Sequence, residues 1–110
     1  MNEEITQFFE KYPQEISDLC FAVREVIYAL PQLKIEEKMW AKMPSYYCSS
    51  RFIRIIPFKN HVNIEASGFA LHKEAFEGCT FTPKGMLQLF PKQKMDLQLL
   101  RLAFLDTLKE

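Results

Sequence analysis

The stretch RFIRIIPFKNHVNIEAS at residues 51–67 constrains the fold more than any other part of this chain. Two runs rich in β-branched residues flank the polar break PFKN, which is typical of a β-hairpin. From His61 to Ala66 polar and apolar side chains alternate, so one face of the second strand is apolar and the other is mixed. The stretch therefore favours an antiparallel sheet with one covered face.

The same alternation predicts the register of the hairpin. A slip of one residue would turn Ile64 to water and Glu65 into the core, and burying an unpaired carboxylate is costly. We therefore expect a loop at residues 58–61 and these cross-strand pairs: Pro57 with Val62, Ile55 with Ile64, Ile53 with Ala66 and, on the other face, Arg54 with Glu65.

Helices are predicted at both ends of the chain. Asn2 is a typical N-cap, and Pro13 suits the first turn of a second helix, which Pro31 ends. The second helix carries an apolar stripe at spacings of three and four residues. This stripe consists of Ile16, Leu19, Cys20, Val23, Val26, Ile27 and Leu30. Near the C-terminus, Asp96 caps a final helix.

Between these helices the pattern predicts strands near residues 38–42 and 86–90 and a short helix that ends at Gly78. Pro44 and Ser45 are expected to break the first of these strands, and residues 46–51 fit either a loop or the start of a strand. The fold class is therefore α+β, with an antiparallel sheet of about four strands packed on one face by the N-terminal and C-terminal helices. With 110 residues, the chain is expected to form one domain, residues 1–110.

The composition of the chain argues against nucleic acids and membranes as partners. Fourteen basic and fourteen acidic side chains give no net charge, whereas a nucleic-acid-binding protein needs a basic excess on one face. No apolar run reaches the roughly 20 residues that span a bilayer, and the acidic N-terminus does not resemble a signal peptide. The three cysteines are widely spaced, so we expect free thiols and a cytoplasmic location, with Cys20 buried and its pKa raised.

Acidic residues concentrate in the first 30 positions, where six acidic and two basic side chains give a net charge of −4. This segment is either a solvated helical face or a surface that docks a partner or attracts cations. Carboxylates are hard oxygen ligands, so weak iron binding at a helix edge needs no further motif. The residues concerned are Glu3, Glu4, Glu10 and Glu15.

A cluster of aromatic residues precedes the hairpin in the segment MWAKMPSYY, residues 39–47. These aromatics either pack in the core or line a groove with Arg51, Lys59 and His61 nearby, which would suit a small acidic or aromatic ligand. The candidate ligand-binding residues are Trp40, Met43, Pro44, Tyr46, Lys59 and His61.

Catalytic motifs are weak. Cys48 and His61 offer a nucleophile and a base only if the fold brings them within hydrogen-bond reach. The cysteines and histidines lack the paired short spacings of a structural zinc site, and the three glycines form no phosphate-binding loop.

The chain also resembles the YdhG-like family, small bacterial proteins classed as a domain of unknown function. The resemblance covers about residues 25–110 and rests on four short motifs in order: Met43-Pro44 with Tyr46, Phe58-Lys59-Asn60-His61, Lys84-Gly85 and Phe90-Pro91. It implies a frataxin-like α+β sandwich. It also implies an iron chaperone that serves an iron–sulfur or haem assembly protein, with Glu3, Glu4, Glu10 and Glu15 at the acidic helix edge.

Three functions are therefore expected, in this order. The first is a non-catalytic binding module that handles iron weakly or docks a partner, without a tightly bound cofactor, as a monomer or homodimer. The second is a small-molecule-binding module with an aromatic and basic pocket. The third is an enzyme that uses Cys48 and His61.

Overall fold

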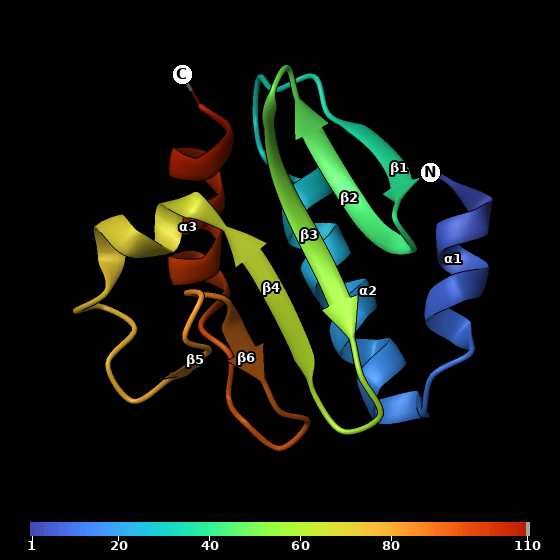
Figure 1. Cartoon of the computed structure of the whole chain (residues 1–110). Helices are drawn as coiled ribbons and strands as arrows, with labels where there is room; N and C mark the ends of the chain where they lie inside the picture. Colours follow the sequence, from blue (N-terminus) through green and yellow to red (C-terminus); the bar gives the residue numbers. More distant parts are fainter. Residues whose placement is uncertain (110) are drawn as a thin grey trace.

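The computed structural model describes residues 1–109, which form an antiparallel sheet with helices on one face (Figure 1). The helices are α1 (Glu3–Glu10), α2 (Gln14–Tyr28), α3 (Leu97–Leu108) and the short 3₁₀ helix η1 (Ser67–His72). The strands are β1 (Glu36–Trp40), β2 (Met43–Cys48), β3 (Arg51–Pro57), β4 (Val62–Ala66), β5 (Thr80–Phe81) and β6 (Leu87–Leu89).

The sheet has six strands in the order β1-β2-β3-β4-β6-β5, and all neighbours are antiparallel. The predicted α+β class is confirmed, but the expected number of about four strands is too low. The two additional strands are β2, which was left open between loop and strand, and the two-residue β5. None of the helices described within residues 1–109 is long and apolar enough to cross a bilayer.

The predicted register of the β3–β4 hairpin is confirmed at every pair. Pro57 lies opposite Val62, and Arg54 lies opposite Glu65, with which it forms an ion pair at 3.3 Å. The face that α2 and α3 cover is fully buried, as alternation requires. Its side chains are Ile53, Ile55, Val62 and Ile64.

The predicted break at Pro44 is wrong, because the turn comes earlier. Ala41 and Lys42 have positive φ angles of 49° and 64°, which fits a two-residue type I′ turn closed by Trp40 and Met43. The next pair in such a hairpin is not hydrogen-bonded, so the proline nitrogen faces away from β1. Pairing of β2 with β3 begins only at Ser45, so the missing N–H of Pro44 leaves no gap in the ladder.

The capping predictions at both ends are confirmed. The side chain of Asn2 accepts a hydrogen bond from the N–H of Ile5, and that of Asp96 accepts one from Leu99. Leu19 and Val26 of the predicted stripe on α2 are half-buried, and its other members are buried. Cys20 is buried, which raises its pKa to about 12, as expected.

Gly68 fixes the position of η1 against α3. A Cβ atom at this position would lie 2.1 Å from the carbonyl oxygen of Ala103 and 2.7 Å from Oγ1 of Thr107. The N–H of Gly68 donates to that hydroxyl, which in turn donates to the Ala103 carbonyl. The absence of a side chain therefore lets η1 dock on the helix backbone.

Candidate functional site

The six candidate ligand-binding residues do not share one cavity. Tyr46 is fully buried on the helix-covered face, whereas Trp40 is 48% exposed on the opposite face of the sheet. Lys59 and His61 lie in the turn between β3 and β4, where His61 stacks between Phe58 and Phe90. Of the six, Lys59 lines the smaller of two hollows described below, and Trp40, Met43, Pro44, Tyr46 and His61 line neither.

The Cys48–His61 pair required for the enzyme hypothesis is not formed. Cys48 ends β2 opposite Arg51, and His61 follows the far end of β3. The six steps along β3 from Arg51 to Pro57 span about 20 Å at the usual rise per residue. A thiol and an imidazole so far apart have no hydrogen-bond contact, which removes the proposed nucleophile and base.

The four N-terminal glutamates are exposed, as expected of a solvated or docking surface: Glu3, Glu4, Glu10 and Glu15. Within residues 1–109, no three His, Cys, Asp or Glu side chains are arranged to hold a metal ion. Iron binding at this helix edge therefore stays a prediction from the carboxylates and from the resemblance, without a formed coordination site in the described residues.

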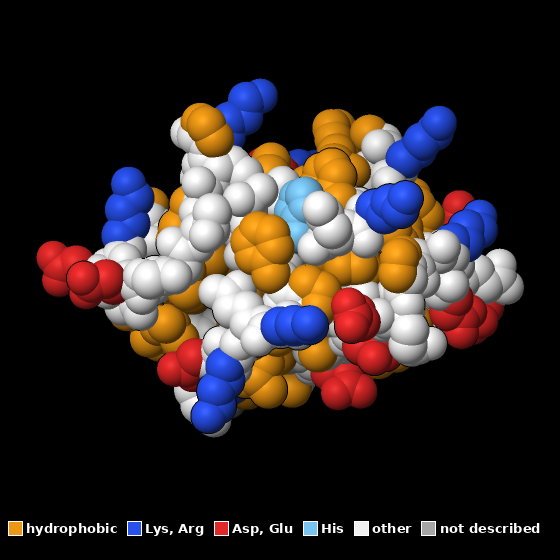
Figure 2. Space-filling view, turned by 90° about the horizontal axis from the view of Figure 1, so that it is seen from below, with side chains coloured by type: hydrophobic (Ala, Val, Ile, Leu, Met, Phe, Trp, Pro, Cys, Tyr) orange, Lys and Arg blue, Asp and Glu red, His pale blue; other side chains and the backbone are white. Residues whose placement is uncertain are grey.

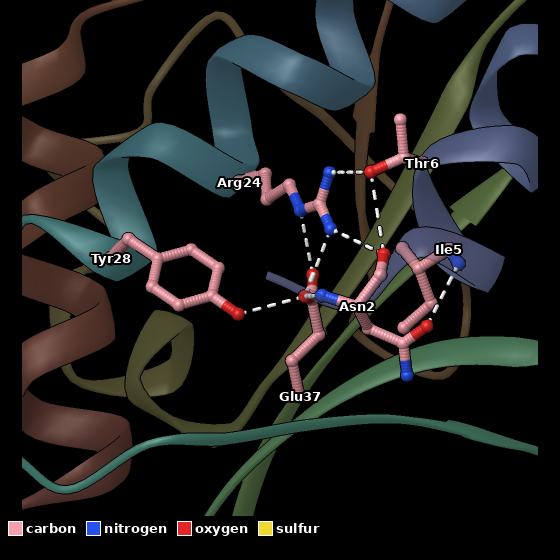
Figure 3. Close-up of polar contacts among 6 residues, drawn as sticks. All are labelled: Asn2, Ile5, Thr6, Arg24, Tyr28 and Glu37. Carbon is pink, nitrogen blue, oxygen red and sulfur yellow. Dashed lines mark hydrogen bonds and ion pairs between the residues drawn. The ribbon is translucent and has the colours of Figure 1, made fainter.

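A buried ion pair lies at the centre of a polar cluster that was not predicted from the sequence (Figure 3). Arg24 of α2 pairs with Glu37 of β1 at 2.7 Å, and their side chains are only 3% and 2% exposed. The guanidinium also donates to Oγ1 of Thr6 and to the carbonyl of Asn2. The carboxylate accepts further bonds from the Asn2 N–H and the Tyr28 hydroxyl. The cluster thereby joins α1, α2 and β1.

The electrostatics of this cluster favour the ionised pair. Burial alone would raise the pKa of Glu37, but hydrogen bonds from Arg24, the Asn2 N–H and Tyr28 outweigh it and lower the pKa below 4.5. Burial and the bond to Glu37 raise the pKa of Tyr28 to about 12. The charged groups of Arg24 and Glu37 are both bonded to structural partners, so the ion pair joins the elements around it and is not free to act on a ligand. Within the described residues the buried hydroxyl of Tyr46, which lies opposite Glu37 in the sheet, has no hydrogen-bond partner.

The uncovered face of the sheet carries a second charged centre, at Arg54. Its guanidinium lies 4.1 Å from the ring centroid of Trp40 and 3.8 Å from that of Phe52. It also donates to the hydroxyls of Ser45 and Tyr47 and pairs with Glu65. Arg54 is therefore engaged within the sheet face and is not available to a ligand.

The smaller hollow lies at the end of the molecule where β3 turns into β4 and has a volume of about 390 Å³. Figure 2 views this end and shows hydrophobic side chains around a histidine, with lysines and arginines between them. The residues that line the smaller hollow are Pro13, Glu15, Ile16, Lys59, Asn60, Phe90, Pro91 and Lys92.

The larger hollow is a half-open cavity of about 790 Å³ at the other end of β4. β6 pairs only with Val62, Asn63 and Ile64, so Glu65 and Ala66 have no strand neighbour on that side. The chain between η1 and β5 loops out to the side of β4 before it returns to β6 (Figure 1). The cavity therefore forms where β4 extends beyond the end of its neighbour.

Aromatic side chains form much of the cavity wall. Phe69, Phe76 and Phe81 contact one another edge to face, with ring centroids 5.3 to 6.0 Å apart. Phe52, Met86 and smaller apolar residues add to this wall, and the half-buried Cys79 also borders it. Such a wall, with a few polar groups around it, is typical of a small-molecule site.

Charged side chains around this cavity are mostly basic. Arg51, Lys73 and Lys84 line it, together with Glu65 and Glu77. Of these five residues, only Arg51 was expected near a ligand-binding groove, and that groove was expected beside Trp40 and Tyr46, which do not line this cavity. No local signal identifies the five residues together, because they come from β3, β4, the segment after η1 and the β5–β6 turn.

Comparison of the chain with protein-family models, with curated proteins and with solved structures finds no match. The fold and the cavity therefore define the protein only as a small α+β domain with an open antiparallel sheet and one aromatic-walled cavity.

Proposed function

We propose that this chain is a non-catalytic binding module that holds a small molecule in the 790 Å³ cavity beside β4. The observation that supports this proposal is the cavity itself, because its volume and its wall of phenylalanines match the sites that take drug-sized ligands. Neither His61 nor His72 lines it, so the half-buried thiol of Cys79 has no imidazole beside it to act as a base.

The test uses a neutral aromatic probe and two matched tryptophan variants. Ala70 lines the cavity and is exposed, whereas Ala75 is also exposed but does not line it. Naphthalene-2-carboxamide is titrated into labelled protein while backbone amide shifts are recorded. We expect shifts centred on the cavity residues, loss of binding in Ala70→Trp and unchanged binding in Ala75→Trp.

A thermal melt of each variant checks that it is folded. If Ala70→Trp does not fold, Ser67→Phe serves as a second variant that fills the cavity. The proposal fails if the probe shifts no cavity resonance. It also fails if a folded, cavity-filled variant binds the probe as well as the original chain does.

A further inference from the structure

The charges around the cavity indicate which class of molecule it accepts, an inference that rests on the proposed binding function. We propose that the ligand is an aromatic carboxylate, with its ring against the phenylalanine wall and its anionic group among Arg51, Lys73 and Lys84. The neutral net charge of the whole chain conceals this local excess of positive charge.

The three cations are free to meet a ligand. Within the described residues, Arg51, Lys73 and Lys84 form no ion pair, and each is exposed. Of the two acidic residues in the lining, Glu65 is already paired with Arg54 at 3.3 Å. Glu77 is then the one carboxylate of the lining that forms no ion pair within the described residues. Three unpaired cations against one unpaired anion favour a negatively charged group.

The cations come from three separate segments that border the cavity. Arg51 begins β3, Lys73 follows η1, and Lys84 lies in the turn between β5 and β6. A carboxylate between two of them would gain charge-assisted hydrogen bonds, and the planar guanidinium of Arg51 suits both of its oxygens.

The aromatic wall selects the other half of the molecule. Phe69 and Phe76 are 2% and 5% exposed, so the deep side of the cavity is apolar. Phe81 stands edge to face against both and, like Phe52, is only half-buried, so these two rings are the part of the wall that a further aromatic ring can contact. A planar ring system with one carboxylate therefore satisfies both sides of the cavity.

The experiment compares naphthalene-2-carboxylate with its neutral amide, since the two differ almost only in charge. We expect the carboxylate to bind at least about fivefold more tightly than the amide at low salt, a factor typical of one or two exposed charge contacts. In the double variant Arg51→Gln/Lys84→Gln that preference should disappear while the affinity for the amide is kept. The matched control, Lys11→Gln/Lys34→Gln, removes the same charge from exposed residues that do not line the cavity.

The outcomes separate this inference from the proposed function. If the carboxylate and the amide bind with equal affinity, and Ala70→Trp abolishes the binding of both, the inference is overturned and the proposed binding function stands. Equal loss of the carboxylate preference in both double variants also overturns it, because a diffuse charge effect would then be responsible. If neither probe shifts a cavity resonance, both proposals are overturned.

Discussion

Glu37→Gln should destabilise the protein far more than any surface substitution of the same kind. The change keeps the shape of the side chain but leaves the guanidinium of Arg24 without a counter-charge at a site where both side chains are about 97% buried. Arg24 donates to both carboxylate oxygens, at 2.7 and 2.9 Å, and in glutamine one of these oxygens becomes an NH2 group that cannot accept a hydrogen bond. The bonds from the Asn2 N–H and the Tyr28 hydroxyl end on a single oxygen, Oε1, and at best they keep a neutral acceptor in its place.

The size of the effect follows from the burial of the remaining charge. Breaking a buried ion pair by removing one partner costs about 3–5 kcal/mol. The total stability of a domain of this size is about 5–15 kcal/mol, so about a fifth or more of it is lost. With a slope of about 1–3 kcal/mol per M urea, the midpoint of unfolding should fall by about 2 M.

Urea unfolding followed by far-UV circular dichroism at pH 7 measures this shift. The control is Glu36→Gln, because Glu36 is the neighbouring residue on β1 but is exposed and lies 3.8 Å from Lys38. We expect that control to change the unfolding free energy by no more than about 0.5 kcal/mol. The double variant Arg24→Met/Glu37→Met should recover most of the stability, since no buried charge is then left unpaired.

Glu37 also makes the free energy of unfolding depend on pH, in a direction that its lowered pKa determines. The pKa of Glu37 is lower in the folded protein than the ordinary 4.5, so the unfolded chain binds its proton first as the pH falls. Its contribution is therefore complete above pH 4.5 and is lost as the pH drops through the folded pKa. The reasoning is refuted if Glu37→Gln costs no more than Glu36→Gln, or if it leaves the acid limb of the stability profile unchanged.

Three further predictions concern the thiols, the η1–α3 contact and the first hairpin. Cys20 should resist a thiol reagent in native protein at pH 8 while the half-buried cysteines react, because burial raises its pKa to about 12; rapid labelling would contradict this. Gly68→Ala should cost about 1–3 kcal/mol by overpacking against α3, and an unchanged urea midpoint would show that η1 shifts freely. Replacing Ala41-Lys42 by Asn-Gly should stabilise the protein by about 1 kcal/mol, since both positions have positive φ, and a lower melting temperature would disprove the turn assignment.

The central hairpin could be predicted in full because its register is decided locally. The branched residues of β3 and β4 lie on one face only if Pro57 pairs with Val62, and any slip would bury Glu65. No comparable signal marks the first hairpin. Ala41-Lys42 lacks the asparagine or glycine that usually identifies a type I′ turn, so Pro44 suggested a break where the strand in fact continues.

The buried cluster was missed for a different reason. Arg24 lies off the apolar stripe of α2, and such a position on an amphipathic helix normally faces water. Its partner Glu37 is 13 residues away on β1, and periodicity within one segment contains no information about such a pairing. Arg24 is buried because β1 and the start of α1 pack over this part of α2.

The cavity was beyond prediction because it results from where one strand stops. β6 ends its pairing with β4 at Ile64, and the alternation within β4 contains no information about where a partner strand stops.

The gap beside β4 also lies far from the buried ion pair, so ligand binding and stability can be altered separately. β1, with Glu37, and β4, beside the cavity, are three strand spacings apart, about 14 Å. Substitutions at such a distance are usually additive, so Glu37→Gln should lower stability without changing the affinity of either probe. Conversely, the exposed Arg51 and Lys84 can be replaced to alter affinity without weakening the fold that forms the cavity.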